Sequence, residues 1–108
     1  PANLWKLPPT EVGQRYVELA GGPDALLESA QAAFDRGDYR WVAELVGHLV
    51  FSDPTNTAAR DLQADAFEQL GYQSESATFR NAYLYGAHEL RFGHPPSNPA
   101  SDAATSPR

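Results

Sequence analysis

Cysteine is absent from this 108-residue sequence, so it can build no disulfide framework, no cysteine-containing zinc site and no thiol nucleophile. The lack of cysteine does not predict a cellular compartment. Long apolar runs are missing too. The longest, from Trp41 to Phe51, is interrupted by Glu44 and His48 and is far shorter than the ~20 residues that a membrane span requires. The pattern of a secretory signal, a basic segment followed by an apolar one, does not open the chain.

Basic residues are few. Eight Lys and Arg stand against 14 Asp and Glu, which gives a formal charge of −6, and nucleic acid is therefore not an expected partner. At 108 residues the chain is one small domain, near the lower limit of what a single core stabilises, so a partner surface would help. The chain begins at Pro1 and not at Met, which indicates a processed product or a piece of a longer polypeptide.

A helix from Asp38 to Ser52 organises the rest of the sequence. Asp38 can accept hydrogen bonds from the free N–H groups of the first turn, and its charge suits that end of a helix. Pro54 lacks an N–H and disfavours helical backbone before it, so the helix should end at Ser52-Asp53. Between these ends, apolar residues recur at the spacing of one buried helix face: Val42, Leu45, Val46, Leu49 and Val50.

Four more helices are expected, because glycines, prolines and polar caps divide the remaining chain at regular intervals. The fold class is therefore all-α, with about five helices in a bundle over residues 10–92. The four helices are bounded as follows: Thr10 as N-cap to Ala20, before Gly21-Gly22; Pro23 to Arg36-Gly37; Asn56 or Thr57 to Gly71; and about Ser74 to Phe92.

The two ends of the chain differ in composition from the helical part. Residues 1–9 contain Leu4, Trp5 and Leu7 and close with two prolines, which predicts an extended apolar strap. This strap lies either across the domain's own helices or against a neighbouring domain or subunit. Residues 93–108 are rich in Pro, Ser and Ala and have no large apolar side chain, so a disordered tail or linker is predicted there.

Two glycines, Gly37 and Gly71, are 34 residues apart, and the same offset relates Ala30 to Ala64. This interval is typical of tetratricopeptide repeats, in which helix–turn–helix units stack side by side. The predicted arrangement is a pair of tetratricopeptide-like hairpins. Two copies are fewer than the three or so that make a stable solenoid, so either the flanking helices or a second subunit must cap the pair.

No pattern for chemistry emerges from the polar residues. Glu44 and His48 are four apart on one helix face and could give two metal ligands, but no third ligand accompanies them, and His88 and His94 lie in no ligand pattern. The motifs of serine hydrolases, P-loops and zinc proteases are absent. No catalytic, cofactor-binding or metal-binding residue is therefore predicted in this chain.

Aromatic residues in the last helix point in several directions, which indicates one inward contact face and one toward a partner. Arg80 falls among its apolar positions and is expected to extend to solvent or to pair with an acidic residue, either across the helical hairpin or across a subunit interface. The predicted interface or strap contacts are Trp5, Tyr16, Tyr39, Trp41, Phe79 and Tyr83.

The chain closely resembles the dimerisation domain of the class III alkylsulfatases, zinc enzymes whose catalytic domain has the metallo-β-lactamase fold. It departs from the family pattern at Gly47, where Asn is common, and at Phe79 and Ala82, where Trp and a larger aromatic are common. The segments that carry the resemblance are PANLW at 1–5, RYVELAGG at 15–22, FDRGDYRWVAEL at 34–45, HLVFSDPTN at 48–56 and ADAFEQLGYQSESATFRNAYLYGAHELR at 64–91.

The resemblance implies a homodimer that contacts the catalytic domain of the same protein. It also implies that this parent hydrolyses alkyl sulfate esters with water activated by two zinc ions. The zinc ligands belong to the catalytic domain and have no matching position here. An alternative is a free-standing tetratricopeptide-like adaptor that binds a partner peptide. An enzyme complete in 108 residues would instead show bound metal or turnover from this chain alone.

Overall fold

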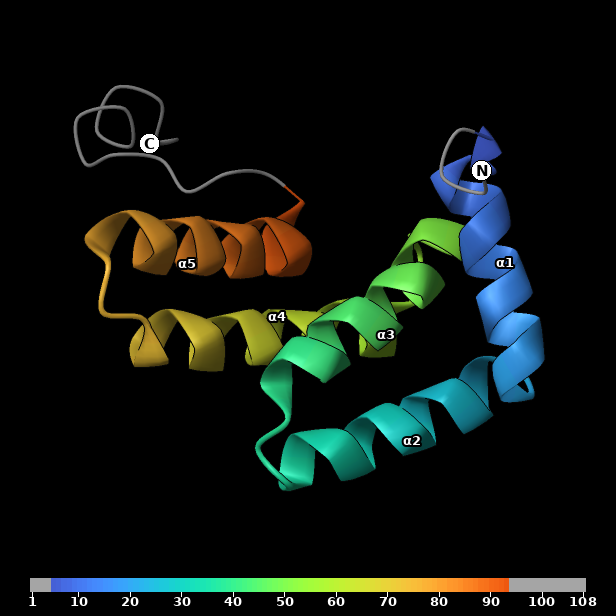
Figure 1. Cartoon of the computed structure of the whole chain (residues 1–108), viewed down its shortest axis with the longest axis horizontal. Helices are drawn as coiled ribbons and strands as arrows, with labels where there is room; N and C mark the ends of the chain where they lie inside the picture. The colour runs from blue at the N-terminus through green and yellow to red at the C-terminus, as the bar shows by residue number, and fades with distance from the viewer. Residues whose placement is uncertain (1–4, 94–108) are drawn as a thin grey trace, which may run out of the picture.

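The computed structural model describes residues 5–93, and these form helices with no strand among them. The predicted all-α class with five helices is confirmed. None of the helices in this part of the chain has the length and apolar character to cross a membrane. In chain order the elements are α1 (Pro9–Ala20), α2 (Pro23–Asp35), α3 (Tyr39–Ser52), α4 (Thr57–Gln73) and α5 (Ala77–Phe92) (Figure 1).

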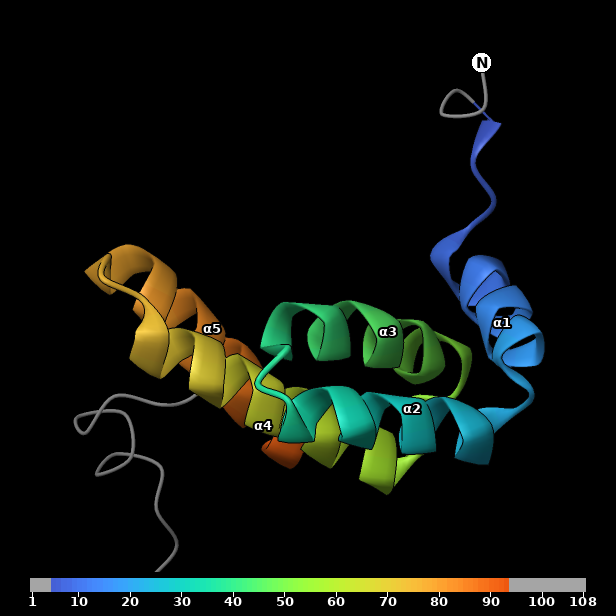
Figure 2. The ribbon, with the colours of Figure 1, turned by 60° about the horizontal axis from the view of Figure 1, so that its bottom comes forward.

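The central element is α3, which packs against α1, α2 and α4. By contrast, α5 lies against α4 and against no other helix of residues 5–93. Figures 1 and 2 accordingly show α1 and α5 at opposite ends of an elongated molecule, whose principal extents are 47 × 31 × 28 Å. The last helix is thus held from one side only.

The core is small and centres on the buried side of α3. Val42, Val46 and Leu49 are buried there as the apolar spacing predicts, while Leu45 and Val50 are partly buried at the edge of the core. Only one large side chain on another helix, Leu26 of α2, is buried as completely among the described residues. Most other buried core residues are alanines, which let the helices approach closely but remove little apolar surface from water.

Several helix boundaries follow the predicted caps. The helix α1 ends at Gly21, whose φ is +100°, a left-handed conformation that glycine adopts without strain. Pro23 is the first residue of α2, and Asn56 accepts a hydrogen bond from the N–H of Ala59 at 3.1 Å. These three predictions are confirmed because each depends on the backbone chemistry of one short segment.

Two predicted helix starts are wrong in detail. The first helix begins at Pro9 and not after Thr10, since a proline at the first helical position loses no hydrogen bond. Asp38 does precede α3, but its side chain makes no capping hydrogen bond. Its backbone carbonyl alone accepts from the N–H of Val42, at 3.1 Å.

Gly71 does not end a helix, contrary to the prediction. It is buried inside α4, which continues to Gln73, and a Cβ at this position would lie 3.0 Å from the side chain of Leu84 in α5. The glycine therefore allows α4 and α5 to pack closely. The 34-residue offset does relate the first residues of two helices, Pro23 of α2 and Thr57 of α4. The two helices differ in length, because α2 has 13 residues and α4 has 17.

Candidate interaction surface

Ten large apolar side chains are exposed among the described residues. Single exposed apolar residues are ordinary, but groups of them mark interaction sites. Here they form two groups, one on the N-terminal segment with α1 and α3 and one on the end of α4 with α5. They are Trp5, Leu7, Tyr16, Leu19, Trp41, Phe51, Tyr72, Phe79, Tyr85 and Phe92.

Three residues of the first group line a groove of about 490 Å³ between the N-terminal segment, α1 and α3, which we call the α1–α3 groove. On its wall the ring of Tyr16 stacks on that of His48, with centroids 4.1 Å apart. Its lining residues are Lys6, Leu7, Pro9, Val12, Tyr16, Glu44, His48 and Phe51.

The closeness of α1 and α3 beside this groove depends on Gly13. A Cβ at Gly13 would overlap the backbone carbonyl oxygen of His48 and would lie 3.2 Å from the backbone nitrogen of Ser52. Both obstacles are main-chain atoms, so no side-chain rotation can relieve them. The sequence signal for this contact is an isolated glycine in a helix, which indicates a packing reason but not the partner.

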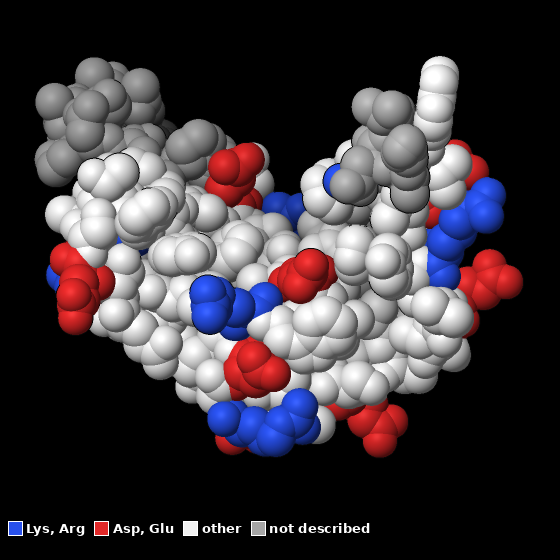
Figure 3. Space-filling model, in the orientation of Figure 1, with Lys and Arg blue, Asp and Glu red and all other residues white. Residues whose placement is uncertain are grey.

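Phe79 of the second group lines a groove of about 370 Å³ between the start of α3, the end of α4 and the start of α5; we call it the α3–α5 groove. The ring of Tyr83 packs at a tilt on that of Phe67, with centroids 6.1 Å apart. Figure 3 shows that the surface over the middle of α5 is mostly free of charged side chains, whereas charged side chains of both signs lie over the start of α3. The groove is lined by Arg40, Leu70, Gln73, Ser74, Phe79 and Tyr83.

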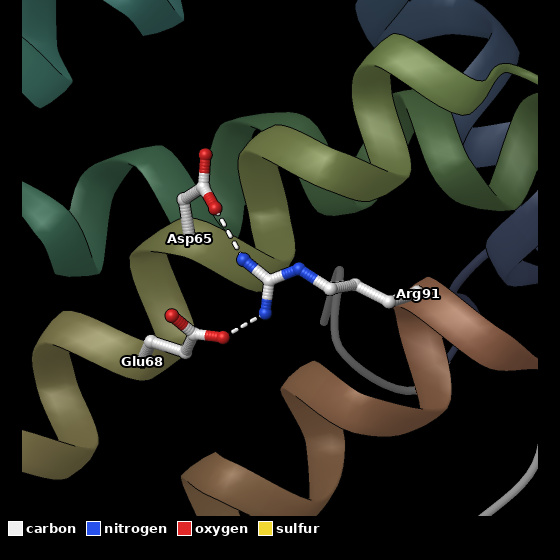
Figure 4. A network of polar contacts seen from close by, with 3 residues as sticks. All are labelled: Asp65, Glu68 and Arg91. Atoms are coloured by element: carbon white, nitrogen blue, oxygen red, sulfur yellow. Dashed lines mark hydrogen bonds and ion pairs between the residues drawn. The ribbon is translucent and has the colours of Figure 1, made fainter.

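An ion-pair network joins the end of α5 to α4. One guanidinium nitrogen of Arg91 donates a hydrogen bond to the carboxylate of Asp65, and the other donates to that of Glu68. Figure 4 shows both carboxylates pointing from α4 toward Arg91. Sequence reasoning missed this network, and for Arg80 it expected either an extension to solvent or an acidic partner; the structure shows Arg80 exposed. Among the described residues Arg80 has no ion pair, and it donates to the carbonyl of Ser74 at 3.0 Å.

A second arginine that sequence reasoning missed also joins α4 to α5. Arg60 on α4 donates to the carbonyls of Leu90 at 2.8 Å and Glu89 at 3.2 Å, and to that of Pro54 at 3.4 Å. The first two carbonyls belong to the last turn of α5, where a positive charge is favourable, and the carbonyl of Glu89 also accepts from the N–H of Gly93 at 2.7 Å.

Replacing Arg60 by methionine should therefore loosen α5 from α4. Because Arg60 is only partly buried, we expect a loss of about 1–2 kcal/mol in the free energy of unfolding, below the upper range for hydrogen bonds to charged groups. Urea unfolding followed by circular dichroism measures it. The exposed Arg36 is the matched control, and an equal loss in Arg36→Met would show that the contacts of Arg60 add nothing.

The structure places the six predicted contact residues on the N-terminal segment and on three helices, α1, α3 and α5. Trp5 is 86% exposed, which favours a neighbouring domain or subunit over the chain's own helices as its contact. Tyr16 lines the α1–α3 groove, and Phe79 and Tyr83 line the α3–α5 groove. Whether these residues touch a partner stays a prediction.

The other two predicted residues begin α3. Trp41 is 46% exposed, on the same helix face as Glu44 and His48. Tyr39 is partly buried and packs edge-on against Phe34, with centroids 5.0 Å apart, so much of its ring is used within the chain. Sequence reasoning omitted Leu19, Phe51, Tyr72, Tyr85 and Phe92, all of them exposed.

The polar candidates do not form a reaction centre. Glu44 and His48 both line the α1–α3 groove, but within residues 5–93 no three His, Asp or Glu side chains gather where a metal could be held. His88 packs on Phe92, with ring centroids 4.6 Å apart. His94 lies outside the described residues.

The departure from the family pattern at Gly47 has a structural explanation. A Cβ at Gly47 would lie 3.1 Å from Nε2 of Gln63, and this nitrogen donates to the carbonyl of Ala43 at 2.9 Å. Gln63 is buried, so this hydrogen bond offsets the cost of removing its amide from water. Gly47 thus makes room for a polar contact between α3 and α4.

Comparison with known proteins gives consistent matches over the helical part. A sequence model of the family described as "Alkyl sulfatase dimerisation" matches residues 1–93. A linear primary-alkylsulfatase from a Pseudomonas species is 59% identical over 93 residues, which is 86% of this chain and 14% of that protein. An alkyl/aryl-sulfatase of Saccharomyces cerevisiae is 57% identical over 95 residues, which is 88% of this chain and 15% of its own length.

A solved structure agrees. The stereoselective inverting sec-alkylsulfatase from a Pseudomonas species matches 92% of this chain with a TM-score of 0.86 and 58% sequence identity, and the match covers 16% of that protein. The chain therefore spans about one seventh of the length of the proteins that it resembles.

Proposed function

Because this chain belongs to the alkyl sulfatase dimerisation family, we propose that it holds two copies of an alkylsulfatase together and fixes their catalytic domains relative to each other. The match of the family model over residues 1–93 carries the proposal. The two groups of exposed aromatic residues on a molecule with a small core fit it, because each would be covered by another part of the assembly.

The parent protein in this proposal hydrolyses alkyl sulfate esters in a separate catalytic domain that holds two zinc ions. The relatives named above are alkylsulfatases and are about seven times longer than the match, which leaves room for such a domain. Residues 5–93 offer no donor set for zinc. Their contribution is assembly, and no step of the hydrolysis is assigned to them.

The peptide-binding adaptor is the weaker alternative. Both grooves could receive an extended peptide, but the relatives that match most of this chain are sulfatases. An adaptor would stay monomeric until its peptide is added, whereas a dimerisation domain associates without one. The two functions therefore differ in the state of the purified chain.

A fusion experiment tests the assembly function. Residues 1–93 joined to a monomeric carrier protein should double the mass of the fusion measured by light scattering. The carrier joined only to residues 94–108 should stay monomeric and serves as the control. A fusion with residues 1–93 that remains monomeric at all accessible concentrations would contradict the proposal.

The proposed activity of the parent needs a separate test. A polypeptide that contains this chain within its full reading frame should release sulfate from an alkyl sulfate and lose that activity when zinc is chelated. Absence of hydrolysis with zinc bound would reject the sulfatase assignment while leaving the dimerisation of this chain intact.

A further inference from the structure

We infer that the outward side of α5 is the surface through which two copies of this chain meet. The inference rests on the proposed function and adds the place of the contact. We call this surface the α5 face, and its residues follow one another at helical spacing along the side of α5 turned away from α4. They are Thr78, Asn81, Ala82, Tyr85, Glu89 and Phe92, all exposed.

The packing of α5 is the first observation. This helix contacts α4 alone, and Ala87 is its one buried residue. Two aromatic side chains, Tyr85 at 58% and Phe92 at 61% exposure, lie seven residues apart on the α5 face. A helix with one packed side and an aromatic outer side is typical of a surface that another molecule covers.

Charge is the second, independent observation. The chain carries a formal charge of −6, so two copies repel each other over most of their surfaces. The exposed side of α2, for example, presents Asp24, Glu28 and Asp35. The α5 face has one charged residue, Glu89. Depletion of charge together with enrichment in aromatics is the composition of interface cores, and a second copy meets little repulsion at this face.

Symmetry sets the arrangement of the contact. In a two-fold dimer the same patch is used on both copies, and we place α5 of one copy antiparallel to α5 of the other. The middle of the helix, near Ala82 and Tyr85, then lies close to the two-fold axis. The small side chain of Ala82 permits a close approach there, and the opposed helix dipoles favour the antiparallel direction.

The size of the contact requires a neighbouring surface as well. A 16-residue helix is ~24 Å long, and one side of it falls short of the ~800 Å² that each partner buries in a stable interface. The α3–α5 groove adjoins the α5 face through Phe79, which is 64% exposed. We therefore place the edge of the contact on this groove.

The test is the replacement of Tyr85 by glutamate in the 108-residue chain. The wild-type chain should sediment at twice the 11.8 kDa of one copy, and Tyr85→Glu should sediment at the mass of one copy with unchanged circular dichroism. The matched control is Leu19→Glu, which places the same charge on an 82% exposed apolar residue of α1 and should leave the dimer intact.

Each other outcome is informative. A dimeric Tyr85→Glu would overturn the assignment of the α5 face while leaving dimerisation in place, whereas a monomeric wild-type chain would reject the proposed function itself. If Tyr85→Glu fails to fold, the wild-type side chains can be kept and a nitroxide label placed at Asn81→Cys, because the chain has no other cysteine. A shorter label-to-label distance from position 81 than from Leu19→Cys supports the inference, and the reverse order contradicts it.

Discussion

Gly13→Ala should destabilise the fold by about 1–3 kcal/mol, the usual range for forcing extra atoms into a packed interior. The new methyl group would overlap the carbonyl oxygen of His48 and press on the backbone nitrogen of Ser52. Since both are main-chain atoms of α3, α1 can accommodate the change only by moving away. That movement would also widen the α1–α3 groove and separate Tyr16 from His48. Urea unfolding gives the loss, and the change in tyrosine fluorescence or near-ultraviolet dichroism reports the separation.

Gly47→Ala is the matched control for this prediction. It makes the same change inside a helix, but the nearest obstacle is the end of a flexible side chain, Nε2 of Gln63 at 3.1 Å. Alanine is also favoured over glycine in helices by roughly 1 kcal/mol. Gly47→Ala should therefore remain within about 1 kcal/mol of the wild type. A Gly13→Ala chain as stable as the wild type would show that α1 and α3 are not in contact at Gly13.

Truncating the core of α3 should have a larger effect. Leu49 is 1% exposed in the helix that contacts α1, α2 and α4, and Leu→Ala at such a site removes about 2–5 kcal/mol of stability. Only three other large side chains, Leu26, Val42 and Val46, are as fully buried in the described part of the chain. Leu49→Ala should therefore leave much of the protein unfolded at low concentration, as measured by circular dichroism at room temperature.

Phe51→Ala on the same helix provides the contrast. Phenylalanine is larger than leucine, but Phe51 is 56% exposed and lines the α1–α3 groove. Its truncation should change the free energy of unfolding by less than about 1 kcal/mol, as is usual for exposed sites. If Phe51→Ala costs as much as Leu49→Ala, the groove is filled in solution by another part of the molecule.

Much of the fold could be predicted from local chemistry. A proline at the first position of α2, glycine in a left-handed cap at Gly21 and the cap at Asn56 all act within a few residues, so the sequence around them suffices. The same holds for the apolar spacing of α3, because its period alone determines which side is buried. The number of helices and the all-α class follow from these signals.

The close contacts between helices could not be predicted in this way. In the sequence Gly71 resembles a helix stop, and only the structure shows that it packs against Leu84 of α5. Likewise, the sequence around Gly13 does not predict its contact with the backbone of His48. Arg91 and Arg80 have the same chemistry, but only Arg91 lies opposite Asp65 and Glu68. The prediction for Arg80, an extension to solvent or an acidic partner, came from its place among apolar positions, which is a property of one helix and not of the pair.

The candidate surface was predicted only in part for the same reason. Aromatic residues were identified as contact candidates by type, and type does not distinguish Tyr39, which packs on Phe34, from Tyr85, which is 58% exposed. Exposure depends on the direction that a residue faces in the assembled bundle. The aromatic residues of the last helix predicted an inward face and a face toward a partner, but which residues form the outer face became known only with the packing of α4 on α5.

The central claim is that a small core and uncovered aromatic surfaces make the stability of this chain depend on a second copy. The thermal unfolding midpoint measured over a wide range of chain concentration tests it most directly. If two copies fold and unfold together, each tenfold increase in concentration favours the folded dimer by about 1.4 kcal/mol, and the midpoint should rise steadily. A midpoint that stays constant over that range, with a mass of 11.8 kDa throughout, would contradict the claim.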